Sequence, residues 1–104
     1  WIFKHDEITN KDDNFIVCEL LRETMLTYLH KEIPYNVNIE TSNFKILKNN
    51  DIKIKQKIII NQKRYKKIIL GKKGEMIKKI REDSQKKMSQ ILDSKIHLYI
   101  EILN

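Results

Sequence analysis

The chain has 104 residues, of which 40% are hydrophobic, and a formal net charge of +7, so it forms one domain with an adequate core. Its single cysteine, Cys18, excludes an internal disulfide framework and a metal site built from cysteines alone. No apolar run approaches the roughly 18 residues of a membrane span, and the first residues lack the apolar segment of a signal peptide. We therefore expect an intracellular protein.

The first expected element is an amphipathic helix over residues 10–31. Pro34 ends it, because the residue before a proline is pushed out of the helical region. Cys18 lies beside the apolar stripe of this helix, and we expect it to belong to the core. The apolar residues that recur at helical spacing are Val17, Leu21, Met25 and Tyr28.

Two strands are expected next, over residues 35–41 and 52–60, because apolar and polar residues alternate in both. The intervening residues 48–51 have the composition of a turn. In the second strand one face carries Ile52, Ile54, Ile58 and Ile60. The lysines of that strand then fall on the other face, where the simple expectation is that they keep the sheet soluble: Lys53, Lys55 and Lys57.

The remainder predicts a short basic helix over residues 63–70, a break at residues 71–74, a helix over 75–92 and a strand over 96–102. The resulting order, α-β-β-α-α-β, predicts an α+β fold with a three-stranded sheet and helices packed on one of its faces. One side of the longer helix carries Ile77, Ile80, Ser84, Met88 and Ile91.

Positive charge is concentrated in the second half of the chain. Residues 1–50 carry six basic and eight acidic side chains, whereas residues 51–104 carry fifteen basic and six acidic ones. Between Lys53 and Arg81 there are twelve basic residues and one acid, Glu75. Such clustering is typical of a polyanion-binding surface, although a solvated face is the simpler alternative.

Both glycines of the protein lie in the break at residues 71–74, which reads Gly-Lys-Lys-Gly. Glycines allow a tight turn and close approach of a ligand, and the start of the following helix favours phosphate. Lys72 and Lys73 add positive charge at the tip, so the pattern indicates a sugar-phosphate ligand. A nucleotide-hydrolysing P-loop is excluded, because Glu75 follows the second glycine and a helix precedes the first.

The segment from Ile68 to Ile80 resembles the signature of a KH domain, an apolar pair followed by GxxG and an isoleucine three residues on. The element order is that of the type II KH fold. Residues 19–23 and 32–35, with the sequences Glu-Leu-Leu-Arg-Glu and Glu-Ile-Pro-Tyr, further resemble the start of the C-terminal KH domain of Era-like GTPases. Residues 6–9 resemble the linker after the GTPase domain of that family, and residues 97–101 its last strand.

The sequence departs from that family's pattern at three positions. Leu70 stands where isoleucine is usual, Arg81 where glycine is frequent and Ser84 where alanine is frequent. The last two lie in the longer helix and affect its local packing.

The resemblance implies that the domain binds single-stranded RNA, with the glycine loop clamping about four nucleotides by their backbone. The clamp is then Gly71, Lys72, Lys73 and Gly74. An apolar groove beside it takes the bases, and further cations contact phosphates. The residues that the resemblance assigns to the groove and to these cations are Ile60, Ile68, Ile69, Ile77, Lys78, Lys66 and Arg81.

The resemblance also implies a place in ribosome assembly, with the 3′ end of small-subunit rRNA and the small ribosomal subunit as partners. Residues 1–10 are then the linker from a missing GTPase domain, and residues 11–104 are a monomeric KH domain. We expect no enzymatic activity or cofactor in these residues, and GTP and Mg²⁺ only in the missing domain. The compartment is the cytoplasm in a bacterium, or a mitochondrion or plastid in a eukaryote.

Two alternatives remain open. A KH module of a ribosomal or transcription protein has the same fold, and a basic protein-docking domain has the same charge. A hydrolytic or metal site is disfavoured, because the histidines lie on three separate elements without a carboxylate cluster: His5, His30 and His97.

Overall fold

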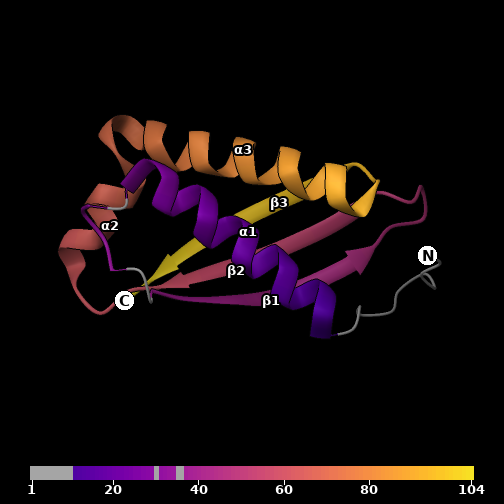
Figure 1. The fold of residues 1–104 in the computed structure, drawn as a ribbon, viewed down its shortest axis with the longest axis horizontal. Helices are drawn as coiled ribbons and strands as arrows, with labels where there is room; N and C mark the ends of the chain where they lie inside the picture. Colours follow the sequence, from indigo (N-terminus) through magenta and orange to yellow (C-terminus); the bar gives the residue numbers. More distant parts are fainter. Residues whose placement is uncertain (1–10, 30, 35–36) are drawn as a thin grey trace.

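The computed structural model describes residues 11–29, 31–34 and 37–104 and shows three helices beside a three-stranded sheet (Figure 1). The predicted order of elements is confirmed. In chain order, the elements are α1 (Lys11–Leu29), β1 (Asn38–Ile46), β2 (Ile52–Ile59), α2 (Lys63–Leu70), the short 3₁₀ turn η1 (Lys72–Gly74), α3 (Glu75–Leu92) and β3 (Ile96–Leu103).

The sheet has the order β1-β2-β3 and is mixed. The first two strands form an antiparallel hairpin, in which Ile46 pairs with Ile52. β2 and β3 run parallel, so Ile52 also pairs with Ile96, and α2, η1 and α3 form the crossover between them. In Figure 1, α1 and α3 both lie in front of the strands, so they cover the same face of the sheet.

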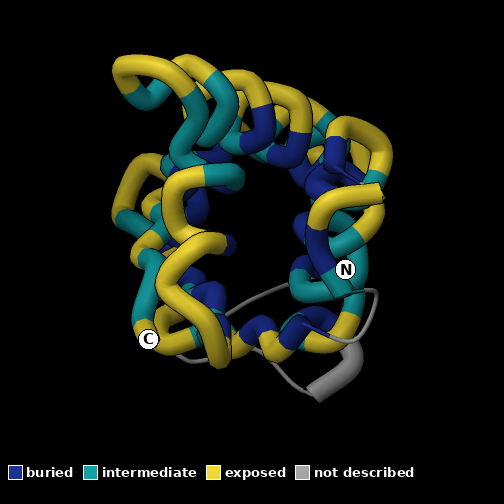
Figure 2. The backbone as a smooth tube through the Cα atoms, turned by 90° about the vertical axis from the view of Figure 1, so that its left-hand side faces the viewer, coloured by how far each residue is buried: buried dark blue, intermediate teal, exposed yellow. Residues whose placement is uncertain are grey.

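The core lies between this face and the helices, because β2 buries every second residue. Figure 2, viewed along the long axis, shows the buried residues toward the inside of the domain and the exposed ones outside. The polar partners of the alternation, including Lys55, point the other way and are exposed or half-buried. Side chains with at most 1% of their surface exposed include Val17, Leu21, Met25, Phe44, Ile52, Ile54, Ile58, Ile69, Ile80 and Met88.

The position of β1 differs from the prediction. The strand begins at Asn38 and continues to Ile46, beyond the expected end at residue 41. Its pairing register shifts between Thr41 and Asn43, so Ser42 is an extra residue in a β-bulge. The bulge resets the alternation, and Phe44 thereby returns to the buried face.

Two residues that the helical spacing places on apolar faces do not lie in the core. Ile91 retains 55% and Tyr28 39% of its surface. Figure 1 shows α1 and α3 diverging toward the C-terminal end of α3, so the last turn of α3 has no helix beside it. Tyr28 lies in the last turn of α1, and its hydroxyl donates a hydrogen bond to the carboxylate of Asp83 on α3.

Polar contacts join α1 to both of its neighbours. Lys87 on α3 donates a hydrogen bond to the hydroxyl of buried Thr24, at 3.3 Å. Toward the sheet, the half-buried Cys18 sulfur lies 3.2 Å from the hydroxyl of Thr41. The amide of Gln56, the polar residue on the buried face of β2, donates to the same hydroxyl at 3.4 Å. Cys18 therefore lies at the edge of the core, as expected.

Candidate functional site

The glycine loop begins where α2 ends. The amide of Gly71 donates to the carbonyl of Lys67 at 2.9 Å, which closes the last turn of the helix. Gly71 has φ of 73°, and a Cβ atom there would lie 2.5 Å from the Cβ and 2.9 Å from the amide nitrogen of Met76. Only glycine allows the chain to pass this close to the start of α3.

The other end of the loop is open. Gly74 has φ of 75° and ψ of 13°, and no atom lies within 4 Å of the position that its Cβ would occupy. Lys73 has the same left-handed backbone, with φ of 55°, which is uncommon for a residue with a side chain. Lys72 and Lys73 are both exposed at this tip.

The start of α3 adds a favourable place for an anion. Gly74 precedes the helix and has no side chain to cap it, so the first turn lacks a side-chain acceptor for its amides. Those amides and the positive end of the helix dipole favour a phosphate. Glu75 is the single acidic residue of that turn and is exposed.

Cations surround the loop on both helices. α2 exposes every basic side chain that it carries, and α3 exposes Lys78 and Lys79 and half-buries Arg81. The guanidinium of Arg64 lies 5.0 Å from the ring centroid of Tyr65, which is itself buried. The exposed cations of α2 are Lys63, Arg64, Lys66 and Lys67.

The predicted apolar groove residues divide into two pairs. Ile68 and Ile77, each three residues from a loop glycine, are half-buried and pack against the core, so part of each faces solvent. Ile60 and Ile69 are 4% and 0% exposed. Both belong to the core and do not form surface beside the loop.

One residue that shapes the loop, Met76, is not predicted by the sequence pattern. Met76 sets the space available to Gly71, and nothing in the GxxG pattern distinguishes it from any other residue in the first turn of a helix. Within the described residues no group of histidine, cysteine and carboxylate side chains has the arrangement of a metal site. Among those same residues, no helix is long and apolar enough to cross a membrane.

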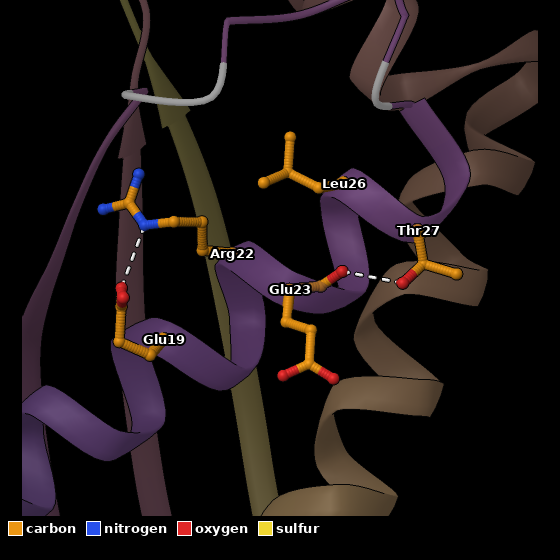
Figure 3. Close-up of a pocket in the computed structure, with 5 residues that line it drawn as sticks. All are labelled: Glu19, Arg22, Glu23, Leu26 and Thr27. Atoms are coloured by element: carbon orange, nitrogen blue, oxygen red, sulfur yellow. Dashed lines mark hydrogen bonds and ion pairs between the residues drawn. The ribbon is translucent and has the colours of Figure 1, made fainter.

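A separate hollow of about 440 Å³ lies on α1 (Figure 3). Its lining is mixed in charge, whereas the surroundings of the glycine loop are basic. Arg22 donates from Nε to Glu19 at 2.9 Å and from its terminal nitrogen to the carbonyl of Val37, so it ties the helix to the segment before β1. With two carboxylates and one guanidinium, the hollow does not suit an anion. Its lining residues are Glu19, Arg22, Glu23, Leu26 and Thr27.

The fold and loop together define the class of protein. The sequence model of the KH domain family matches residues 32–103, so the chain belongs to the KH domain family. It is also similar to the GTPase Era of Rickettsia typhi, with 40% identity over 100 residues, and to that of Ehrlichia canis, with 37%. Each match covers 96% of this chain and 34% of the relative.

Solved structures of Era have the same fold. Aquifex aeolicus Era bound to GDP and AlF₄⁻ matches with a TM-score of 0.82 and 26% identity, over 98% of this chain and 35% of that one. A crystal structure of Era in complex with MgGDPNP and nucleotides 1506–1542 of 16S ribosomal RNA has the same TM-score and identity, over 98% and 34%. The chain thus spans about a third of the length of these relatives.

Proposed function

We propose that this domain binds single-stranded RNA through the glycine loop and acts as the KH domain of a longer, Era-like GTP-binding protein. Its partner is then small-subunit rRNA near the 3′ end, during assembly of the small ribosomal subunit. That partner would place the domain in the cytoplasm of a bacterium or within an organelle. The relative solved with a fragment of 16S ribosomal RNA supports this partner.

The observation that carries the proposal is the loop geometry. Gly71 lies against Met76 without a side chain, so the turn is fixed, while the opposite side at Gly74 is open for a ligand. Exposed Lys72 and Lys73 and the start of α3 supply positive charge on this open side. Backbone clamping of about four nucleotides is the mode of binding that such loops support.

Beside the clamp, half-buried Ile68 and Ile77 offer apolar surface for bases, and exposed Lys66 and Lys78 offer charge for further phosphates. Arg81, half-buried in the second turn of α3, is a further cation of the proposed site.

The residues described here do not fit GTP. A helix precedes Gly71, whereas a strand precedes a P-loop. Gly74 is followed by Glu75 and Met76, whereas the second glycine of a P-loop is followed by a lysine and a serine or threonine. No step of GTP chemistry is therefore assigned to this domain. In the proposal, residues 1–10 are the linker to the GTPase domain, and they lie outside the described residues.

The test is fluorescence anisotropy with a labelled oligomer of about six nucleotides from the 3′ end of small-subunit rRNA, against a scrambled oligomer, over a salt series. We expect preference for the rRNA sequence and a log–log salt slope near −3, since about four phosphates contribute roughly 0.7 each. The variant Lys72→Asp/Lys73→Asp should lose binding, with little change in melting temperature because both side chains are exposed.

A matched control makes the same change of charge at the opposite end of the sheet, with Lys48→Asp/Lys95→Asp. Both residues are exposed, in the turn after β1 and in the segment before β3. This control should retain most of the binding of the short oligomer. Equal, weak binding of both oligomers by all three proteins would overturn the proposal and leave a docking role for the basic surface.

A further inference from the structure

The face of the sheet that points away from the helices has an uneven distribution of charge. Strand register places its residues in rows across the three strands. In Figure 1 this face lies behind the strands, and the helices lie in front. From the start of β2 to its end, the rows are Lys45–Lys53–His97, Asn43–Lys55–Tyr99, Glu40–Lys57–Glu101 and Asn38–Ile59–Leu103.

The first two rows form what we call the outer basic surface, defined by Lys45, Lys53, Lys55 and Tyr99. Lys45 and Lys53 are directly opposite each other on neighbouring strands, an arrangement of like charges that destabilises a sheet. Among the described residues neither Lys53 nor Lys55 has an ion-pair partner. In the part of the chain that the structure describes, this half of the face therefore carries positive charge on Lys53 and Lys55 that no carboxylate neutralises.

An aromatic ring lies among these lysines. Tyr99 is directly opposite Lys55 and keeps 52% of its surface exposed. The Lys53 ammonium lies 5.7 Å from the centroid of the same ring. An exposed tyrosine that only covers the sheet does not need cations around it. A ring flanked by cations can instead stack on a base while the cations contact the neighbouring phosphates.

The adjacent row has the opposite character. Lys57 lies on the same strand and face as Lys55, two residues further on, but its cross-strand neighbours are Glu40 and Glu101. Beside the first row there is also one carboxylate, Asp51, whose Oδ2 lies 2.8 Å from Nε2 of His97. Uniform solubilisation of the sheet would not produce this contrast between neighbouring rows.

We propose that the outer basic surface is a second binding site for single-stranded RNA, separate from the glycine loop. Phosphates contact Lys53 and Lys55, and a base stacks on Tyr99. An acidic peptide would satisfy the lysines equally well but gains little from the exposed ring, so the observations favour RNA. The assignment extends the proposed function and fails independently of it.

Its place in the fold predicts which RNAs reach it. The loop lies at the start of α3, whereas the first rows lie at the start of β2, beside the segment that follows the end of α3 (Figure 1). The domain is 40 Å along its longest axis, and the two sites lie toward opposite ends of it and on different faces. A short oligomer therefore occupies the loop alone, and a long one reaches both.

The experiment compares labelled rRNA-derived oligomers of about six and about 24 nucleotides, with Lys55→Gln tested against its matched control Lys57→Gln. For the long RNA, Lys55→Gln should weaken binding and lower the salt slope by about 0.7, the contribution of one phosphate. Lys57→Gln should leave the slope unchanged. Neither variant should alter binding of the short oligomer.

The variant Tyr99→Leu separates stacking from charge. It should weaken binding of the long RNA about tenfold without changing the salt slope, because a stacked base releases no counterions. Equal effects of Lys55→Gln and Lys57→Gln would overturn the site, as would long-RNA binding that depends on Lys72 and Lys73 alone. Binding of polyglutamate that depends on Lys55, with RNA unaffected, would instead assign the surface to an acidic protein.

Discussion

The inner face of the sheet holds Phe44, Ile54 and Ile58 by complete burial, whereas the loop from Gly71 to Gly74 keeps its shape without a single buried side chain. The sheet is fixed by apolar area removed from water. The loop is fixed by backbone conformation and by the approach of Gly71 to Met76. Stability and the proposed contact with RNA consequently depend on different residues, and Gly71 is the position at which the two requirements coincide.

The largest expected effect lies in the sheet core. Phe44→Ala should lower the free energy of unfolding by about 3–5 kcal/mol, because it removes a ring that is 1% exposed and leaves a cavity. Urea denaturation measures this loss. The matched change Phe15→Ala, at a ring that is 66% exposed on α1, should shift the free energy by no more than about 0.5 kcal/mol.

Gly71→Ala tests the position where the two regions meet. We expect a loss of about 2–4 kcal/mol in urea denaturation, because the new Cβ meets the backbone of Met76 in addition to adopting a left-handed φ. If the loop binds RNA as proposed, affinity for the short oligomer should fall together with stability. A variant as stable as the parent would show that the close approach to Met76 does not hold the loop.

Gly74→Ala should cost about 1 kcal/mol, since its left-handed φ strains the new side chain but no atom lies nearby. Gly74→Asn should cost less, because asparagine tolerates this backbone. A loss of stability at Gly74 as large as that at Gly71 would contradict the view that Gly71 is required by steric contact and Gly74 by its backbone conformation alone. The measurement is the urea midpoint of the three variants side by side.

The smallest expected effect concerns Tyr28, outside both regions. The hydrogen bond to Asp83 raises the pKa of Tyr28 above its ordinary value of 10.0, with burial and the Asp83 charge as lesser causes. The folded pKa is therefore higher than the unfolded one, so the contribution to stability is complete below pH 10 and disappears as pH rises through the folded pKa. The difference in urea midpoint between the parent and Tyr28→Phe should shrink over that range. A difference that stays constant would contradict the hydrogen bond.

The hydrophobic periodicity of the sequence predicted correctly those elements in which a single alternation or helical spacing continues from end to end. Burial alternates along the whole of β2, with Gln56 as the one polar residue on the buried face, so its position and its buried face agree with the prediction. In β1 the extra residue Ser42 breaks the alternation, and the polar stretch around it conceals the second half of the strand. Ile91 continues the stripe of α3 faithfully, but periodicity does not show that α1 has diverged from it.

The candidate site shows the same division. The glycines and lysines of the loop, and the phosphate chemistry they favour, are local features that the sequence predicts. The difference between Gly71 and Gly74 depends on the path of the backbone at Met76, which no spacing encodes. Likewise, the contrast between Lys55 and Lys57 depends on their neighbours across the sheet, and those appear only with the strand register.

The parallel pairing of β2 with β3 also has a consequence for the order of folding. The hairpin of β1 and β2 closes over a short turn, whereas Ile52 meets Ile96 only after the whole crossover has folded between them. Contacts between residues so distant in the chain form slowly, because the entropy of closing the long segment is lost before the contacts form. The glycine loop lies inside that segment, and its defining approach, between Gly71 and Met76, joins residues close in the chain, so it does not depend on the docking of β3. A chain released before β3 docks would therefore already have its hairpin and its loop, but only two strands of the sheet.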